Sequence, residues 1–197
     1  MSIAGKKLNQ PASNSSSDKQ EAAAAELLEH LIEVVDEHDK PVGYMPLEDV
    51  RRQALYHRQV IVLVYNEKNK IFLQKKEALK KRGKSLWDVS TSAPICAEQS
   101  AEETALAALS QELGITLQGL RPIGQALAGP STGNAFISVF STGMVPLEHI
   151  HSHPVVKNGF FFDHEEISSL VEHYREMLSP SLLLLWDMGV VFPASSF

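Results

Sequence analysis

The chain of 197 residues contains a single cysteine, Cys96, and has no long apolar run. One cysteine can form neither an internal disulfide nor a cysteine zinc site, which agrees with a reducing compartment. The longest apolar stretches, 60–65 and 182–186, fall far short of the roughly 20 residues that cross a bilayer. The first residues are polar and contain no apolar block typical of a secretory signal. We therefore expect a cytoplasmic protein without a membrane partner.

Positive charge is concentrated in one segment, and the rest of the chain has an excess of negative charge. The net charge is −6, from 18 basic and 24 acidic residues. Residues 75–84 hold six basic residues and one acidic residue, a local charge of +5, so the rest of the chain carries −11. Binding to duplex nucleic acid requires many phosphate contacts over a broad basic surface. The charge pattern therefore argues against nucleic acid as a partner and favours a small anion at this basic segment.

Length and composition predict one main domain, because a domain usually takes roughly 100 to 200 residues. Hydrophobic residues make up 44% and charged residues 21% of the chain, as in globular proteins. Residues 1–20 are rich in serine and poor in large apolar side chains, which predicts a disordered tail. Alanine and leucine favour a helix over 21–30. We expect the domain over 31–190, followed by a C-terminal tail at 191–197.

Short apolar runs between turn residues predict a sheet with a few helices. The runs 59–65 and 71–74 form the clearest hairpin, and 32–36 with 42–45 predict a second. Ser100 and Glu103 fit a capping box and Gly114 fits a left-handed C-cap, which predicts a helix between them. Further strands are expected at about 87–90, 120–126, 135–141 and 159–162, and further helices at about 46–54, 164–177 and 180–188. This order is typical of an α+β domain.

The end of the capped helix, Glu112-Leu113-Gly114-Ile115, resembles the end of a Nudix box. That box reads Gly, five residues, Glu, seven residues, then Arg-Glu-apolar-any-Glu-Glu-any-Gly-apolar. Other features follow in the order of the family: 35–37 before a hairpin, 57–58 before the long strand, 72–76, and Trp87 before the box loop. They are most similar to the branch of isopentenyl diphosphate isomerases and related Nudix hydrolases. The resemblance implies a Nudix-like α/β/α sandwich with a mixed sheet.

Most charged positions of that box hold other residues in this chain. Counted back from Gly114, the box positions are Ala93, Gln99, Ala107, Ala108, Gln111 and Glu112. Positions 108, 111 and 112 share one helix face, where the family's carboxylates would hold Mg²⁺ on a diphosphate. The structural Glu–Arg pair that the resemblance implies at 99 and 107 is missing as a whole, so no lone charge remains. We expect a retained scaffold that binds Mg²⁺ or Mn²⁺ weakly if at all.

The resemblance assigns candidate site residues. Glu112 is the predicted catalytic and metal-binding residue, and Glu98, one residue before the missing first glutamate, is the second catalytic candidate. The predicted substrate-binding residues are Lys80, Lys81, Arg82 and Lys84 of the basic segment, together with His57.

His57 matches a histidine position of the isomerases, but the rest of the isomerase pattern is missing. Ser92 stands at the position of the isomerase cysteine and Pro94 at that of the following histidine, while Cys96 is out of register. The later acid would fall near Asn134 and Ala135. We therefore do not expect isomerase chemistry.

Two other polar patterns could indicate ligand binding. His149, His151 and His153 alternate, so on an extended segment they could face one side and bind zinc or copper. In a polar loop that ends at Pro154, simple exposure is the preferred interpretation. Residues 131–134 predict a turn rather than a phosphate-binding loop, because no helix follows them.

Three functions remain open. The chain could be a divergent Mg²⁺-dependent pyrophosphohydrolase that acts on nucleoside diphosphate-linked compounds through Glu112 and non-standard acids. It could be a binding protein that keeps affinity for a small diphosphate-type anion while hydrolysis is weak or lost. It could also be a homodimerising structural domain. The reduced acidic face at 108, 111 and 112 favours the second function.

Overall fold

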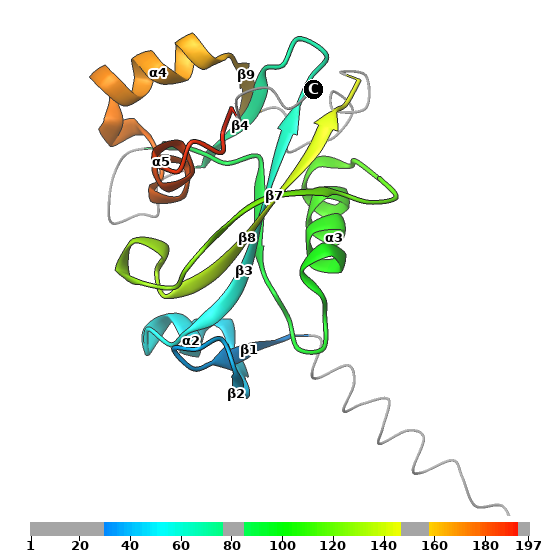
Figure 1. The fold of residues 1–197 in the computed structure, drawn as a ribbon, viewed down its shortest axis with the longest axis vertical. Coiled ribbons are helices and arrows are strands. Elements are labelled where there is room, and N and C mark those ends of the chain that lie inside the picture. The colour runs from blue at the N-terminus through cyan, green and yellow to red at the C-terminus, as the bar shows by residue number, and fades with distance from the viewer. Residues whose placement is uncertain (1–29, 77–84, 147–157, 193–197) are drawn as a thin grey trace, which may run out of the picture.

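The computed structural model describes residues 30–76, 85–146 and 158–192 (Figure 1). The predicted N-terminal tail, nearly all of the predicted N-terminal helix, the four basic residues at 80–84, the three histidines at 149–153 and the last five residues lie outside these ranges.

A mixed sheet is built around strand β3 (His57–Tyr65). On one side β3 runs parallel to β8 (Ala135–Met144), which in turn pairs antiparallel with β7 (Arg121–Ala126). On the other side β3 pairs antiparallel with β6 (Thr91–Pro94). The apolar pattern does not predict β6, because its sequence Thr-Ser-Ala-Pro is short, small and ends in proline.

A second group of strands leaves the central sheet at the predicted hairpin. Strand β4 (Ile71–Lys76) pairs with β3 where Tyr65 faces Ile71, and then diverges from it. It continues between β5 (Leu86–Asp88) and β9 (Gly159–Phe162), both antiparallel to it. Beyond Ile71, β4 is therefore paired with β5 and β9 rather than with β3.

The first predicted hairpin, β1 (Leu31–Val35) and β2 (Pro41–Pro46), joins the sheet through Val34, which faces His57. Helix α2 (Leu47–Arg52) follows it directly and ends two residues before the predicted boundary. Both predicted hairpins are confirmed.

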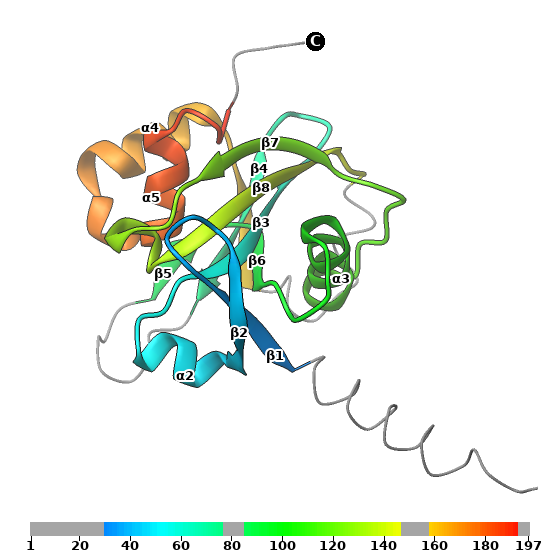
Figure 2. The ribbon, with the colours of Figure 1, turned by 60° about the horizontal axis from the view of Figure 1, so that its bottom comes forward.

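Helices cover both faces of the sheet (Figure 2). Helix α3 (Ala101–Leu113) packs on one face, and α4 (His164–His173) with α5 (Pro180–Asp187) lies on the other. The predicted helix over 164–177 ends early, at His173, and a 3₁₀ turn follows at 175–177, because Tyr174 leaves the helical region with φ −140° and ψ 37°. No helix in the described ranges is long and apolar enough to cross a membrane.

Strand β3 is buried on both faces, so its alternate side chains supply two cores. Val60, Val62 and Val64 pack toward α3, where they meet Leu109 and Leu113. The intervening side chains pack toward α4 and α5, in a core that contains Ile61, Leu63, Ile167, Leu182 and Leu185. This arrangement confirms the predicted α/β/α sandwich with a mixed sheet. Val191 is also buried, so the packed chain extends slightly beyond residue 190.

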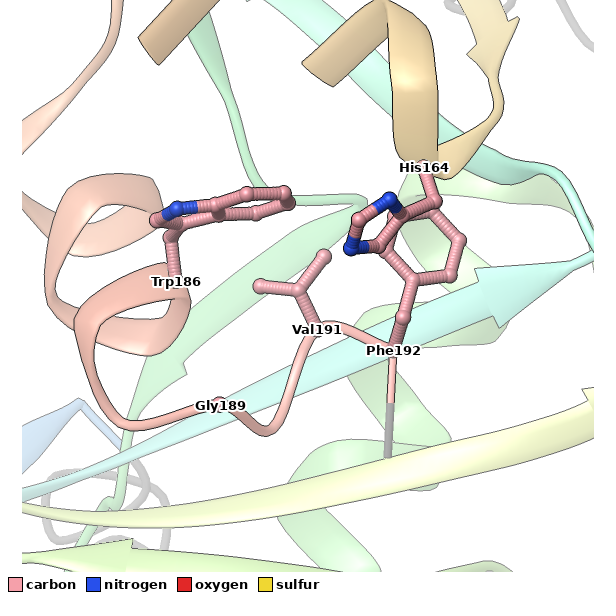
Figure 3. Close-up of a pocket in the computed structure, with 5 residues that line it drawn as sticks. All are labelled: His164, Trp186, Gly189, Val191 and Phe192. Carbon is pink, nitrogen blue, oxygen red and sulfur yellow. The ribbon is translucent and has the colours of Figure 1, made fainter. Parts of the chain in front are cut away.

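The core beneath α4 and α5 ends in a cluster of aromatic side chains (Figure 3). The imidazole of His164 lies with its centroid 5.3 Å from Trp186 and 5.4 Å from Phe192. Together with Val191 and Gly189 these rings surround a cavity of about 70 Å³, which is large enough for two or so water molecules. This cavity is a packing gap at the edge of the core and offers little room for a ligand.

Candidate functional site

Helix α3 carries Glu112 in its last turn, and the helix is delimited as the sequence predicts. Ser100 accepts a hydrogen bond from the Glu103 N–H, the Glu103 carboxylate accepts from the Ser100 N–H, and Gly114 closes the helix with φ +67°. A left-handed residue of this kind is strongly favoured to be glycine. The caps fix where α3 begins and ends, and Glu112 lies in its last turn, in contact with β4 and β6.

The carboxylate of Glu112 is held by neutral donors from two strands. Thr91 Oγ1 on β6 donates to Glu112 Oε2 at 2.6 Å, and Gln74 Nε2 on β4 donates to the same oxygen at 3.2 Å. Gln74 Nε2 also donates to the Ser90 carbonyl at 2.5 Å, which fixes its amide. Among the described residues Glu112 forms no salt bridge. One carboxylate oxygen is thus occupied by protein hydrogen bonds.

Neither Thr91 nor Gln74 is predicted as a site residue, although Gln74 belongs to the family-like segment 72–76. Both are buried polar residues, Gln74 on a strand distant in sequence from α3 and Thr91 on the strand just before it. A polar residue in an otherwise apolar strand such as Ile-Phe-Leu-Gln is a usable signal, because buried polar groups need partners. Which partner it meets depends on the tertiary structure.

The remaining box positions hold uncharged residues. Ala108 is buried, whereas Ala107 and Gln111 are exposed. Thr104 Oγ1 donates to Gln99 Oε1 at 3.1 Å. A neutral hydrogen bond therefore ties the loop before α3 to the helix, in the region where the resemblance implies an ion pair.

The Mg²⁺ that the resemblance implies does not fit these residues as a site held by the protein alone. Mg²⁺ requires six oxygen ligands in octahedral geometry and usually takes one or two carboxylates with substrate phosphates. The face at 108, 111 and 112 offers one carboxylate, and one of its oxygens already accepts two hydrogen bonds. Within the described ranges no three His, Cys, Asp or Glu side chains are grouped to hold a metal ion.

Glu98 lies in the turn between β6 and α3. Its backbone has φ +63°, in the left-handed region that few non-glycine residues occupy. Its side chain is exposed, and in the described part of the chain we find no hydrogen bond or salt bridge that links it to Glu112. Its catalytic role stays a prediction.

His57 lies on the other face of the sheet from Glu112. Thr91 points to Glu112, whereas the next residue, Ser92, lines a cleft together with His57. Successive side chains of a strand point to opposite faces, so the sheet separates the two groups. The structure therefore does not bring the predicted substrate-binding histidine to the predicted catalytic carboxylate.

The His57 imidazole is buried and held in one tautomer. It is 6% exposed, and its Nδ1 lies 3.1 Å from the Leu55 carbonyl oxygen. A carbonyl can only accept, so Nδ1 carries the proton of the neutral ring. Burial lowers the pKa of His57 below its ordinary value of 6.5; the hydrogen bond to Leu55 opposes this shift, and the charge of Arg51 adds to it. The ring is therefore neutral near pH 7.

This shifted pKa predicts a pH-dependent stability. When the pH falls below 6.5, the unfolded chain binds a proton at residue 57 before the folded chain does, so the free energy of unfolding decreases. The slope from this group is at most about 1.4 kcal/mol per pH unit. Urea unfolding between pH 7.5 and 5.5 should show a shallower decrease for His57→Asn than for the original chain. His38→Asn, at an exposed histidine, should keep the original slope; equal slopes in all three proteins would show that His57 is not responsible.

The known proteins that resemble this chain in sequence agree with the resemblance seen in the box-like helix. No family model matches the chain. The uncharacterized Nudix hydrolase PA4841 of Pseudomonas aeruginosa is 28% identical over 111 residues, which cover 56% of this chain and 66% of that protein. The isopentenyl-diphosphate Delta-isomerase of Nocardia farcinica is 31% identical over 94 residues, which cover 47% of this chain and 53% of that protein. The chain thus matches between about half and two thirds of the length of these relatives.

Solved structures agree with this fold. The Deinococcus radiodurans protein DR0079 superposes with a TM-score of 0.64 at 19% identity, covering 80% of this chain and 98% of that one. A MutT protein from Methanosarcina mazei gives a TM-score of 0.50 at 20% identity, covering 68% and 91%. At such identities the likeness concerns the fold. Together with the sequence relatives, it supports the assignment of the chain to the Nudix superfamily, as its box-like helix predicts.

Proposed function

We propose that this Nudix-fold chain binds a small diphosphate-containing ligand on the Glu112 side of its sheet, with weak or lost hydrolysis. The observation that carries the proposal is the state of the helix face. Ala108 and Gln111 supply no carboxylate, and Oε2 of Glu112 is occupied by Thr91 and Gln74. The Nocardia farcinica relative, named for isopentenyl diphosphate, a diphosphate compound, supports the ligand class.

Weak hydrolysis follows from the missing carboxylates. A metal in such sites neutralises charge that develops on the phosphate and helps to generate the attacking hydroxide. If each missing ligand group costs a few kcal/mol of transition-state stabilisation, the rate falls by orders of magnitude, since 1.4 kcal/mol is about tenfold. Mg²⁺ or Mn²⁺ would then bind weakly, with the phosphates of the ligand supplying most of the oxygen atoms.

The basic segment supports an anionic ligand on this side. Gln74 touches Glu112, and the segment 77–84 begins three residues later. We assign Lys80, Lys81, Arg82 and Lys84, which lie outside the described residues, to the phosphates of the ligand.

Replacing Lys81 and Arg82 by alanine should weaken binding of a nucleoside diphosphate sugar and reduce its salt dependence. Exposed charges are screened over about 8 Å at physiological ionic strength, so the original chain should bind more weakly as salt is added. Calorimetry at low and high salt measures both effects. A matched control, Lys40→Ala with Lys68→Ala, removes two charges from the exposed turns of the two hairpins. Equal affinity and salt slope in both double variants would make the basic segment a merely solvated loop.

Calorimetric titration tests the proposal directly. Mg²⁺ or Mn²⁺ alone should give little binding heat, and the same metals should bind measurably once a nucleoside diphosphate sugar is present. Glu112→Gln should remove this cooperative binding. Adding Gln118→Glu to that variant supplies a carboxylate at an exposed position beyond the helix and should not restore the binding. Tight metal binding without the sugar nucleotide would overturn the proposal.

The alternative function is an active, divergent pyrophosphohydrolase that uses Glu112 with Glu98. The observation in its favour is that Glu98 precedes the first turn of α3 by a few residues, next to the position of the missing glutamate. The relative named a Nudix hydrolase is consistent with it. The two functions differ in turnover, which Mg²⁺-dependent release of phosphate products measures.

A further inference from the structure

A cleft of about 290 Å³ lies where the turn between β1 and β2 meets strands β7 and β8 (Figure 2). The turn contributes Glu37 and Asp39 to its lining, and β3 contributes Arg58. Phe136 on β8 and Leu127, directly after β7, also line it. Since a water molecule takes about 30 Å³ of liquid, the volume corresponds to about ten waters. The cleft therefore has room for side chains of a peptide segment.

This cleft is separate from the Glu112 site. On β3, Arg58 precedes Val62 by four residues, which span about 13 Å of strand. Val62 pairs with Thr91, and Thr91 contacts Glu112. Glu112, Thr91 and Gln74 are not among the described residues that line the cleft. An occupant of the cleft is therefore independent of the function proposed above.

Negative charge dominates in and around the cleft. Arg58 Nε donates to Asp39 Oδ1 at 2.7 Å, and Arg58 Nη1 donates to Glu33 Oε2. Glu37 is a third carboxylate, with a side chain that is 73% exposed and an Oε1 that lies 3.7 Å from His38 Nε2. With His38 neutral, three carboxylates against one guanidinium leave a charge of −2. The cleft thus favours a positively charged occupant.

The same cleft has apolar lining residues. Leu127 is 82% exposed. Phe136 is half-buried, and its ring centroid lies 6.3 Å from that of Tyr56. Covering such side chains removes apolar area from water, which is favourable. A well-matched occupant therefore carries apolar side chains as well as positive charge.

Residues 3–8 of the same chain have this combination. They read Ile-Ala-Gly-Lys-Lys-Leu, and they lie outside the described residues. Lys6 and Lys7 supply two positive charges, as many as the excess negative charge of the cleft, and residues 1–17 contain no acid that opposes them. Ile3 and Leu8 supply apolar side chains on either side of the two lysines. The segment is thus complementary to the cleft in both respects.

The chain is long enough for this contact. The described residues begin at His30, directly before β1, and the turn that lines the cleft follows the other end of that strand. Strand and turn together span about 25 Å. Leu8 precedes His30 by 22 residues. Even with a helix over 21–30, which adds about 15 Å, the other residues reach about 40 Å when extended. A tethered segment also meets its site at an effective concentration of up to about millimolar, so a weak contact suffices.

We propose that residues 3–8 bind in this cleft of the same chain, with the two lysines beside the carboxylates of Glu37 and Asp39. The apolar side chains at the two ends of the segment cover Leu127 and Phe136. Exposed apolar surface promotes association with other molecules. The contact keeps this surface covered, and it weakens when salt screens the charges.

A nitroxide spin label close to the segment tests this contact. In the chain with Ser2→Cys and Cys96→Ser, the label is attached to the one remaining cysteine. It should broaden the backbone amide NMR signals of Leu127 and Ser138, which line the cleft. The signal of Leu170 on α4, on the other side of the sheet, should stay sharp. Added salt should reduce the broadening.

Charge reversal tests the partners. Lys6→Glu with Lys7→Glu should weaken the contact about tenfold, because like charges then face each other at an exposed site. Glu37→Lys added to that variant should restore part of the broadening. Glu67→Lys, at the exposed turn of the other hairpin, is the matched control and should not restore it.

A measurement without the label covers the case in which Cys96→Ser does not fold. The amide shifts of Leu127 and Ser138 in the original chain should change when Lys6 and Lys7 are reversed together. Lys19→Glu, which reverses a charge outside residues 3–8, should leave these shifts unchanged.

Three results would overturn the proposal. The signals of Leu127 and Ser138 could be sharp and unshifted in every variant, or the broadening could persist after both lysines are reversed. Broadening could also arise only between spin-labelled and isotope-labelled copies mixed in one sample. That last result would assign the cleft to a second copy of the chain.

Discussion

Replacing Ser90 by alanine is expected to lower the free energy of unfolding by about 2–4 kcal/mol, because it leaves two buried backbone groups unpaired. Ser90 is fully buried where β4 diverges from β3. Its Oγ accepts from the Val64 N–H at 2.9 Å and donates to the Phe72 carbonyl at 2.6 Å. One hydroxyl thus replaces the strand-to-strand hydrogen bonds that the divergence removes.

Urea unfolding of Ser90→Ala measures this cost. Ser131→Ala, at an exposed serine, is the matched control and should change the free energy of unfolding by less than about 0.5 kcal/mol. A loss for Ser90→Ala as small as that of the control would show that Val64 and Phe72 find other partners. The bridging role of Ser90 would then be wrong.

Replacing Gly159 by alanine should also destabilise the fold, by about 3 kcal/mol, since overpacking of a dense core costs roughly this much. An added Cβ would lie 2.5 Å from Phe72 Cε2 and 2.9 Å from the Leu73 carbonyl oxygen. Phe72 is 1% exposed and its ring packs against Phe161 at 5.3 Å, so it has no space into which it can move. The backbone of β9 must then shift away from β4.

Thermal and urea unfolding of Gly159→Ala test this prediction. Gly43→Ala is a matched control on another strand, because no atom lies within 4 Å of its added Cβ. The double variant Gly159→Ala with Phe72→Leu, in which a smaller side chain replaces the ring, should recover part of the lost stability. A Gly159→Ala protein as stable as Gly43→Ala would contradict the close packing of β9 on Phe72.

Local patterns in the sequence are sufficient for much of this fold. The hairpins around 38–41 and 66–70 follow from apolar runs on either side of turn residues, and helix α3 follows from Ser100, Glu103 and Gly114. These features depend on contacts within a few residues, so propensity and capping decide them. The fold class follows from their order and from the box-like helix end.

The site is less predictable because its contacts are non-local. Strand β6 has too few apolar residues to be recognised, yet its alternation sends Thr91 to Glu112 and Ser92 to the cleft of His57. A pattern match to family positions cannot reveal that the sheet separates these residues. The partners of Glu112 also depend on how β4 leaves β3, which involves residues up to 38 positions apart in the sequence.

The proposal that hydrolysis is weak or lost is tested most directly by release of phosphate products from nucleoside diphosphate-linked compounds in the presence of Mg²⁺ or Mn²⁺. We expect the purified chain to release no more than Glu112→Gln does, because one carboxylate with an oxygen already occupied replaces the acidic helix face. Robust Mg²⁺-dependent release by the original chain, abolished in Glu112→Gln and reduced in Glu98→Gln, would contradict this and establish the divergent hydrolase.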